Sequence, residues 1–201
     1  AGTTTCISSN QTAGTVTINS GVVSFDGNQS PNRLAAGKLV TVNSGGTMQV
    51  LGVNALPNHA NSVNVTLNGG TLRVVTGTSP STNDTVGSHA HMGNLTLNGG
   101  TIDLGYAGSG VTYNEESFQL NGNITVTGST PSAITSGPGT NAGNSGIALQ
   151  GARTFDVADV TSSPAADLVI QAELENTDAP GGSLIKTGSG TLQLAGAIAH
   201  S

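Results

Sequence analysis

Few residues in this sequence have side chains suited to metal binding. His89 and His91 are one residue apart, so on a β-strand both imidazoles would lie on the same face. Imidazole is a common ligand of transition metals, and this pair is the best candidate in the chain. A complete site needs further ligands, and Asp84 is the only acidic residue close in sequence. The sequence therefore predicts no metal or other cofactor. If a metal does bind, His89 and His91 are the candidate ligands.

The carboxylates do not form an evident catalytic pair. Glycoside hydrolysis uses two carboxylates about 5 to 10 Å apart across the sugar. Glu115 and Glu116 are adjacent, so an extended chain points them in opposite directions, and the odd spacing of Asp156 and Asp159 does the same. We expect the acidic residues to lie at the solvated surface and predict no catalytic residue.

The composition indicates an all-β protein. The chain has 201 residues, of which 30 are Gly, and only 8% are charged and 2% aromatic. Thr, Ser and Asn are abundant, and strong helix formers other than Ala are sparse. Thr, Val and Ile favour strands, whereas Gly, Asn and Ser favour turns.

The charge and the apolar pattern exclude two classes of partner. The net charge is -6, and the basic residues are scattered, so no basic face for nucleic acid can form. There is no run of 18 apolar residues, so we expect no membrane insertion. The single cysteine, Cys6, excludes an intramolecular disulfide and is expected to be a buried small residue or a crosslink to another subunit. The five basic residues are Arg33, Lys38, Arg73, Arg153 and Lys186.

One phrase recurs along the chain: apolar-Thr-apolar-Asn, then a glycine-containing turn, then a second alternating run. Its clearest copies are residues 65–74 and 95–104, with further copies at 16–25, 40–50 and 118–126. The marker asparagines are Asn19, Asn43, Asn68, Asn98 and Asn121, at intervals of 24, 25, 30 and 23 residues. A drifting period of this size is typical of a solenoid.

Each half of the phrase alternates with period two, so one side of a short strand is buried and the other solvated. A two-residue hairpin at Asn-Gly is the competing interpretation. The repetition of one phrase per period favours a β-solenoid of roughly eight coils with loop insertions, in a single domain covering residues 1–201. The repeat further predicts that Val42, Leu67, Leu97 and Leu120 stack in one internal ladder.

Outward positions on neighbouring coils should also meet. Arg73 and Asp103 occupy equivalent places in the two clearest copies, which predicts an ion pair across adjacent strands. We expect loops at residues 76–85, 106–116 and 128–146, strands at 155–157 and 168–170, and a turn at 178–182. Insertions of this kind gather on one side of a solenoid, which is often the binding side.

Residues 184–196 resemble the autotransporter-associated β-strand repeat, also called the passenger-associated transport repeat. The matching residues are Lys186, Gly188, Gly190, Thr191, Leu192, Leu194 and Gly196. The upstream phrases resemble the filler coils of the same passengers. The resemblance implies a right-handed parallel β-helix that is secreted or exposed at a bacterial cell surface.

Three functions are compatible with these observations. The first is an extracellular structural or adhesive solenoid, without catalysis, that binds a surface or glycan ligand through its loops. The second is a subunit that stacks head to tail into an extracellular filament, because open strand edges template association. The third is a polysaccharide-acting enzyme. The residues predicted to meet in a filament are Val16, Thr17, Ile18, Leu184, Leu192 and Leu194.

Overall fold

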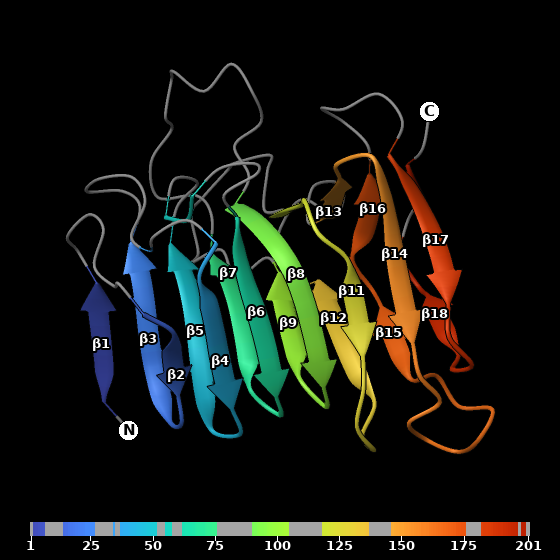
Figure 1. The fold of residues 1–201 in the computed structure, drawn as a ribbon, viewed down its shortest axis with the longest axis horizontal. Coiled ribbons are helices and arrows are strands. Elements are labelled where there is room, and N and C mark those ends of the chain that lie inside the picture. Colours follow the sequence, from blue (N-terminus) through green and yellow to red (C-terminus); the bar gives the residue numbers. More distant parts are fainter. Residues whose placement is uncertain are drawn as a thin grey trace.

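The computed structural model describes residues 2–6, 14–26, 34, 37–51, 55–57, 62–75, 90–104, 118–136, 146–175, 182–196 and 198–199. All regular elements within these residues are β-strands, and their ladders are parallel. The prediction of an all-β parallel solenoid is therefore confirmed, and the hairpin alternative is wrong. Figure 1 shows the coils side by side along a rod.

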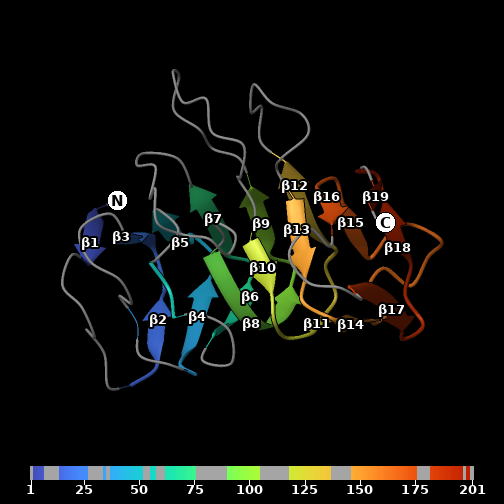
Figure 2. The same cartoon turned by 90° about the horizontal axis from the view of Figure 1, so that it is seen from above.

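One side of the rod is an eight-stranded sheet in the order β1-β3-β5-β7-β9-β12-β15-β18. Neighbours in this sheet come from successive coils rather than from adjacent elements. Figure 2 shows these strands opposite the strands of the second sheet. The bounds are β1 Thr3–Cys6, β3 Gly21–Asp26, β5 Gly46–Leu51, β7 Thr71–Val75, β9 Thr101–Leu104, β12 Ser132–Ser136, β15 Leu168–Ile170 and β18 Leu192–Leu194.

The second sheet has eleven strands and forks at β8, Ala90–Asn98. Residues 95–97 of β8 pair with β11, whereas residues 90–92 pair with β10. The long branch contains β2 Val16–Ile18, β4 Leu39–Asn43, β6 Val63–Asn68, β11 Ile124–Val126, β14 Ala152–Val157 and β17 Ser183–Thr187. The short branch contains β10 Phe118–Leu120, β13 Gly146–Leu149, β16 Glu173–Glu175 and β19 Ile198–Ala199.

The number of regular coils differs from the expectation of roughly eight. About four turns, β2–β3, β4–β5, β6–β7 and β8–β9, have the two-strand form that the repeated phrase describes. From β10 onward each turn has three short strands. The two halves of β8, which are continuous in that turn, are matched in the next turn by two separate strands, β10 and β11.

Glycine is required where the phrase turns between the two sheets. Gly69 has a φ of 69°, a left-handed value that side chains disfavour. A Cβ on the following residue, Gly70, would lie 2.6 Å from the carbonyl oxygen of Val42 in the preceding coil. The Asn-Gly-Gly corner therefore permits both the sharp turn and the close stacking of coils.

The apolar core runs through the whole rod as ladders of equivalent side chains. Ile18, Val42, Leu67 and Leu97 occupy consecutive rungs, and all are buried. The predicted ladder is confirmed as far as Leu97, but its next member is Val126 and not Leu120. Leu120 lies on the short branch of the second sheet, where it pairs with Met92 and Leu149.

Two further expectations can be compared with the strands. Residues 155–157 and 168–170 lie in β14 and β15, as predicted. The single long loop predicted at residues 128–146 is wrong, because β12 lies within it and pairs with both β9 and β15. Its central residue, Ile134, is buried and gives this polar segment an anchor in the core. The loops at 76–85 and 106–116 and the central part of the turn at 178–182 lie outside the described residues.

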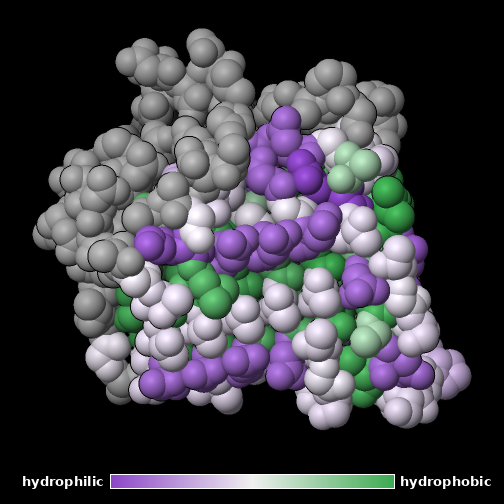
Figure 3. Space-filling view, in the orientation of Figure 1, coloured by the Kyte–Doolittle hydropathy of each residue, from purple (hydrophilic) through white to green (hydrophobic). Residues whose placement is uncertain are grey.

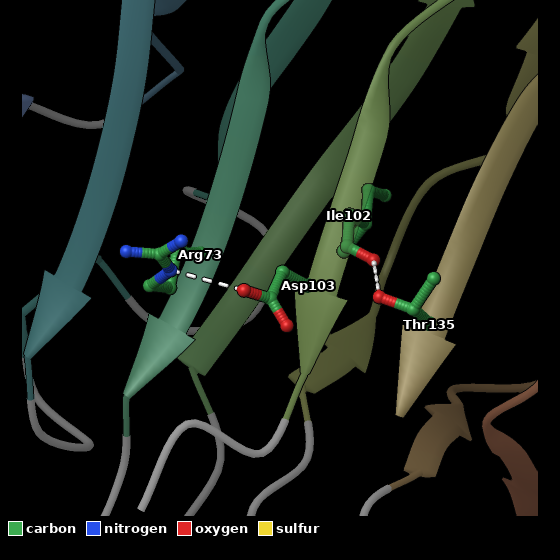
Figure 4. Close-up of polar contacts among 4 residues, drawn as sticks. All are labelled: Arg73, Ile102, Asp103 and Thr135. Carbon is green, nitrogen blue, oxygen red and sulfur yellow. Dashed lines mark hydrogen bonds and ion pairs between the residues drawn. The ribbon is translucent and has the colours of Figure 1, made fainter. Parts of the chain in front are cut away.

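The predicted pair of Arg73 and Asp103 is confirmed. Their strands β7 and β9 are in register, and Arg73 Nε lies 3.0 Å from Asp103 Oδ2 (Figure 4). Both side chains are partly exposed, so we expect the pair to stabilise the fold by roughly 0.2–1 kcal/mol. The next coil continues the row with Thr135, whose hydroxyl donates to the carbonyl oxygen of Ile102 at 3.3 Å.

Replacing Leu97 by Asp tests the core ladder. The carboxylate would be buried between Leu67 and Val126 without a partner, so we expect the free energy of unfolding to fall by about 3 kcal/mol or more. Urea denaturation followed by circular dichroism measures this loss. Thr96→Asp is the matched control, because residue 96 is on the same strand and faces outward; equal losses for the two variants would contradict the ladder.

Candidate functional site

An open groove of about 440 Å³ runs along the rod where the two branches of the second sheet meet. Its lining residues come from five consecutive coils, so its long direction follows the stacking of the coils. We call it the axial groove. The residues that line it are Gly37, Ser62, Asn64, Gly93, Asn94, Asn121, Gly122, Gln150 and Arg153.

Asparagines at the start of the long-branch strands form a chain of hydrogen bonds from coil to coil. The backbone N–H of Asn94 donates to Asn64 Oδ1 at 2.8 Å, and that of Asn123 donates to Asn94 Oδ1 at 2.9 Å. The N–H of Thr154 then donates to Asn123 Oδ1 at 3.0 Å. Only the oxygen of an asparagine side chain can accept a hydrogen bond from a backbone N–H. These bonds therefore fix which way each side-chain amide is turned.

The amide NH2 groups of these asparagines are left as donors. Nδ2 of Asn64, Asn94 and Asn123 makes no hydrogen bond within the part of the chain that the structure describes. We call these three residues the donor row. Asn64 and Asn94 line the axial groove, and Asn123 continues the row one coil further.

A second row of asparagines on the same sheet has a different hydrogen-bond pattern. Asn43 Nδ2 donates to Asn19 Oδ1 at 2.7 Å, and Asn68 Nδ2 donates to Asn43 Oδ1 at 3.1 Å. In this row the side-chain amides bond to one another, and Asn43 uses both its NH2 group and its oxygen, which is a structural role. Figure 3 shows two hydrophilic rows along this side of the rod, separated by white and green side chains.

Close approach of the coils explains two of the glycines of the groove, Gly93 and Gly122. A Cβ on Gly122 would lie 2.4 Å from the backbone nitrogen of Asn94 in the preceding coil. Any side chain here would push the coils apart and break the adjacent hydrogen bond of Asn94. The floor of the groove is therefore bare backbone beside the donor row.

Asn121 connects three coils inside the groove. Its Nδ2 donates to Ser62 Oγ at 3.0 Å and lies 3.2 Å from Nδ1 of His91. An NH2 group can only donate, so Nδ1 of His91 acts as the acceptor. His91 is 5% exposed, and His89 lies outside the described residues. Among the residues that the structure describes, no group of three His, Cys, Asp or Glu side chains is placed to hold a metal.

Arg153 is the one charged residue among the described residues that line the groove. Its Nη2 donates to the carbonyl oxygen of Gln150, whose side-chain Oε1 accepts from Gln119 Nε2. Nε of Arg153 is buried and has no hydrogen-bond partner within the described residues. Burial lowers the pKa of Arg153, but a guanidinium remains protonated at neutral pH.

Two of the candidate catalytic carboxylates, Asp156 and Asp159, lie within the described residues, and each accepts a hydrogen bond from a neighbouring group. Asp156 accepts from Thr187 Oγ1 at 3.1 Å, and Asp159 accepts from the N–H of Ser162 at 2.7 Å. Both are exposed, as expected. Glu115 and Glu116 lie outside the described residues.

Asp167 contradicts the expectation that the acidic residues lie at the solvated surface. It is fully buried, and its Oδ1 accepts from the N–H groups of Val160 and Thr161, each at 2.8 Å. Its Oδ2 accepts from the N–H of Thr191 at 2.7 Å, one coil away. The Thr191 bond is the largest cause of a lowered pKa of Asp167, burial opposes it, and the bonds from Thr161 and Val160 add to it. Asp167 therefore fixes the segment 158–166 to the rod.

The residues predicted to form a filament contact lie in strands at the two ends of the sheets. Val16, Thr17 and Ile18 form β2, which pairs only with β4. Leu184 lies in β17, and Leu192 and Leu194 lie in β18, which pairs only with β15. Cys6 lies in β1 in register with Phe25.

Comparison of the chain with protein-family models, with curated proteins and with solved structures gives no match. Within the described residues there is no helix long and apolar enough to cross a membrane.

Asp167→Asn tests the role of the buried carboxylate. The pKa of Asp167 is lower in the folded than in the unfolded chain, where it is about 3.9. Its stabilisation is therefore present above roughly pH 4 and is lost as the pH falls through the folded pKa.

An Asn side chain would place an NH2 group against one of the three backbone donors. We expect Asp167→Asn to lower the melting temperature at pH 7. The melting temperature of this variant should also fall less on acidification than that of the wild type. Thermal melts between pH 7 and pH 2 measure both effects, with the exposed Asp159→Asn as control. Parallel pH profiles for wild type and Asp167→Asn would contradict this assignment.

Proposed function

We propose that this chain is a non-catalytic, structural and adhesive β-solenoid, extracellular or at a bacterial cell surface, that binds a surface glycan. The observation that carries the proposal is the axial groove. It crosses five consecutive coils and is lined by amide, hydroxyl and backbone groups. A groove along the stacking direction suits an extended polymer, which can contact every coil that it crosses.

The chemistry of the lining supports a glycan. Asn and Gln amides and the Ser62 hydroxyl can exchange hydrogen bonds with sugar hydroxyls, which carry donors and acceptors on each residue. Among the described residues that line the groove there is no carboxylate that could act as the acid or base of glycoside hydrolysis. We propose the groove rather than the loops as the binding surface, because its asparagine side chains are held in place by hydrogen bonds to the neighbouring coils.

Gln150→Ala tests this function. Loss of one hydrogen-bonding side chain should weaken polysaccharide binding by roughly 2- to 10-fold. Binding to an array of plant and bacterial polysaccharides, followed by titration calorimetry, measures it. Gln49→Ala is the matched control, because Gln49 lies on β5 in the opposite sheet.

Two results would contradict the proposal. One is the absence of binding to any polysaccharide on the array. The other is steady release of reducing ends or of unsaturated sugars from a bound polymer, which would show an enzyme instead.

Head-to-tail stacking is a second candidate, and a different observation favours it. Three of the exposed large apolar residues lie in the last strands of the chain: Ile185 is 48%, Leu194 37% and Ile198 56% exposed. Pairing of β17 and β18 with the β2 and β1 edges of a second copy would cover this apolar surface and satisfy the open backbone groups. Such a contact is heterologous and propagates into a filament unless it closes a ring.

Ile198→Lys should weaken this stacking by placing a charge on the apolar edge. Analytical ultracentrifugation over a range of protein concentrations measures the mass of the assemblies. Leu39→Lys is the control, because Leu39 is 38% exposed but lies between two paired strands. Thr17→Pro, which removes a backbone donor from β2, should shorten the assemblies from the other end. A wild-type chain that stays monomeric at high concentration would exclude stacking.

A further inference from the structure

We infer that the donor row and Arg153 together select a linear glycan with sparse carboxylates: uncharged sugars lie along the asparagines, and one uronate carboxylate pairs with the guanidinium. This inference rests on the proposed function and names the class of ligand for the same groove.

The first step is the polarity of the donor row. Each asparagine oxygen already accepts one hydrogen bond from the backbone of the next coil, whereas each NH2 group makes none within the described residues, so the row offers mainly donors to a ligand. A row of donors is complementary to a row of acceptors. Ring, glycosidic and hydroxyl oxygens along one edge of a glycan chain provide such a row.

The second step is the limited length of the row. Neighbouring coils are about 4.8 Å apart, so three asparagines place donors over roughly 10 Å. The equivalent positions beyond the row are Leu39 before Asn64 and, after Thr154, Ile185. Both of these apolar side chains are exposed, at 38% and 48%. The amides are therefore confined to a short site of a few sugar units and do not extend along the whole rod.

The third step is the charge of the groove. Arg153 supplies one positive charge among the lining residues, and the chain as a whole has a net charge of -6. A polymer with a carboxylate on every sugar would be repelled by the rest of the molecule, whereas one carboxylate beside Arg153 gains a charge-assisted hydrogen bond. The fifth coil of the groove, which carries Arg153, therefore distinguishes a sparsely acidic glycan from a neutral one.

The charge step can be tested with one polymer in two forms. The probes are glucuronoxylan, whose uncharged backbone carries occasional uronate groups, and the same polymer after chemical reduction of its carboxyl groups. We expect the wild-type chain to bind the native form about tenfold more tightly at low salt. The preference should shrink in 1 M NaCl, where charges are screened beyond about 3 Å.

Arg153→Gln should remove this preference, so that the variant binds the native and the reduced polymer equally. Arg73→Gln is the control, because Arg73 lies on β7 in the opposite sheet. If the Arg153→Gln variant keeps the preference, or if Arg73→Gln removes it, the assignment of the carboxylate to Arg153 is wrong.

Asn94→Asp tests the donor row without removing its structural bond. The new carboxylate still accepts from the N–H of Asn123, but it presents an acceptor where the NH2 donor was. We expect the affinity for both forms of the polymer to fall at least tenfold. Gln49→Glu makes the same change of amide to acid on the opposite sheet and should bind as the wild type does. Unfolding curves confirm that both variants are folded.

The outcomes separate this inference from the proposed function. Equal binding of the two polymers by the wild type, or unchanged binding by Asn94→Asp, overturns the inference while glycan binding stands. Failure of the wild type to bind any polysaccharide overturns both.

Discussion

The structure depends on one constraint: each coil must lie directly on the previous one, in register, at the spacing of hydrogen-bonded β-strands. Because the ladders are parallel, every residue lies beside its equivalent in the next coil and not beside a residue close in sequence. This explains why the buried positions are aliphatic in coil after coil, as in the ladder from Ile18 to Val126. It also explains the glycines at the corners, since a Cβ on Gly70 would occupy the place of the preceding coil.

The same constraint decides what a polar side chain can do at the surface. An asparagine on a stacked strand can bond to the like asparagine one coil away, as Asn43 does with Asn19. Alternatively, it can accept from the backbone of the next coil, as Asn64 does from Asn94. The first arrangement uses donors and acceptors alike, whereas the second leaves a set of parallel NH2 donors. Two rows that are similar in composition therefore differ in the groups that they expose, and the difference comes from where the next N–H group lies.

The sequence predicted the strands correctly in the part of the chain where each copy of the repeated phrase forms one two-strand coil. Through Asn98 the apolar-Thr-apolar-Asn phrase marks the strands, and the predicted contact of Arg73 with Asp103 followed from it. From residue 118 the prediction is wrong, because Phe118–Leu120 followed by Asn121 and Gly122 has the same pattern but occupies a different branch of the sheet. The true equivalents of Leu95–Leu97 are Ile124–Val126. Periodicity identifies strands but does not distinguish one side of a coil from another.

The candidate site was harder to predict for the same reason. The donor row depends on which atom of Asn64, Asn94 and Asn123 faces the backbone of the next coil, and this is set by the register and the bend rather than by residue type. Asp167 was missed because its three backbone partners come from its own loop and from Thr191 in the following coil. In sequence it resembles any other surface acid before a short strand.

The side and the ends of the rod expose different groups and so suit different kinds of contact. Along the side, polar groups are held by hydrogen bonds to the neighbouring coil, so they are ordered before any ligand arrives and lose little entropy on binding. At the last coil, Lys186 stands in register with the buried Phe155, and its ammonium donates to the carbonyl oxygens of Thr187 and Gly188. Its aliphatic stem thus lies at the end of an apolar ladder while its charge is satisfied locally. Edge pairing with a second copy would leave the axial groove uncovered, because the groove spans coils in the middle of the rod. Lateral binding of a glycan and stacking through the ends are therefore compatible within one molecule, and a filament of such rods would present the groove once per subunit along its length.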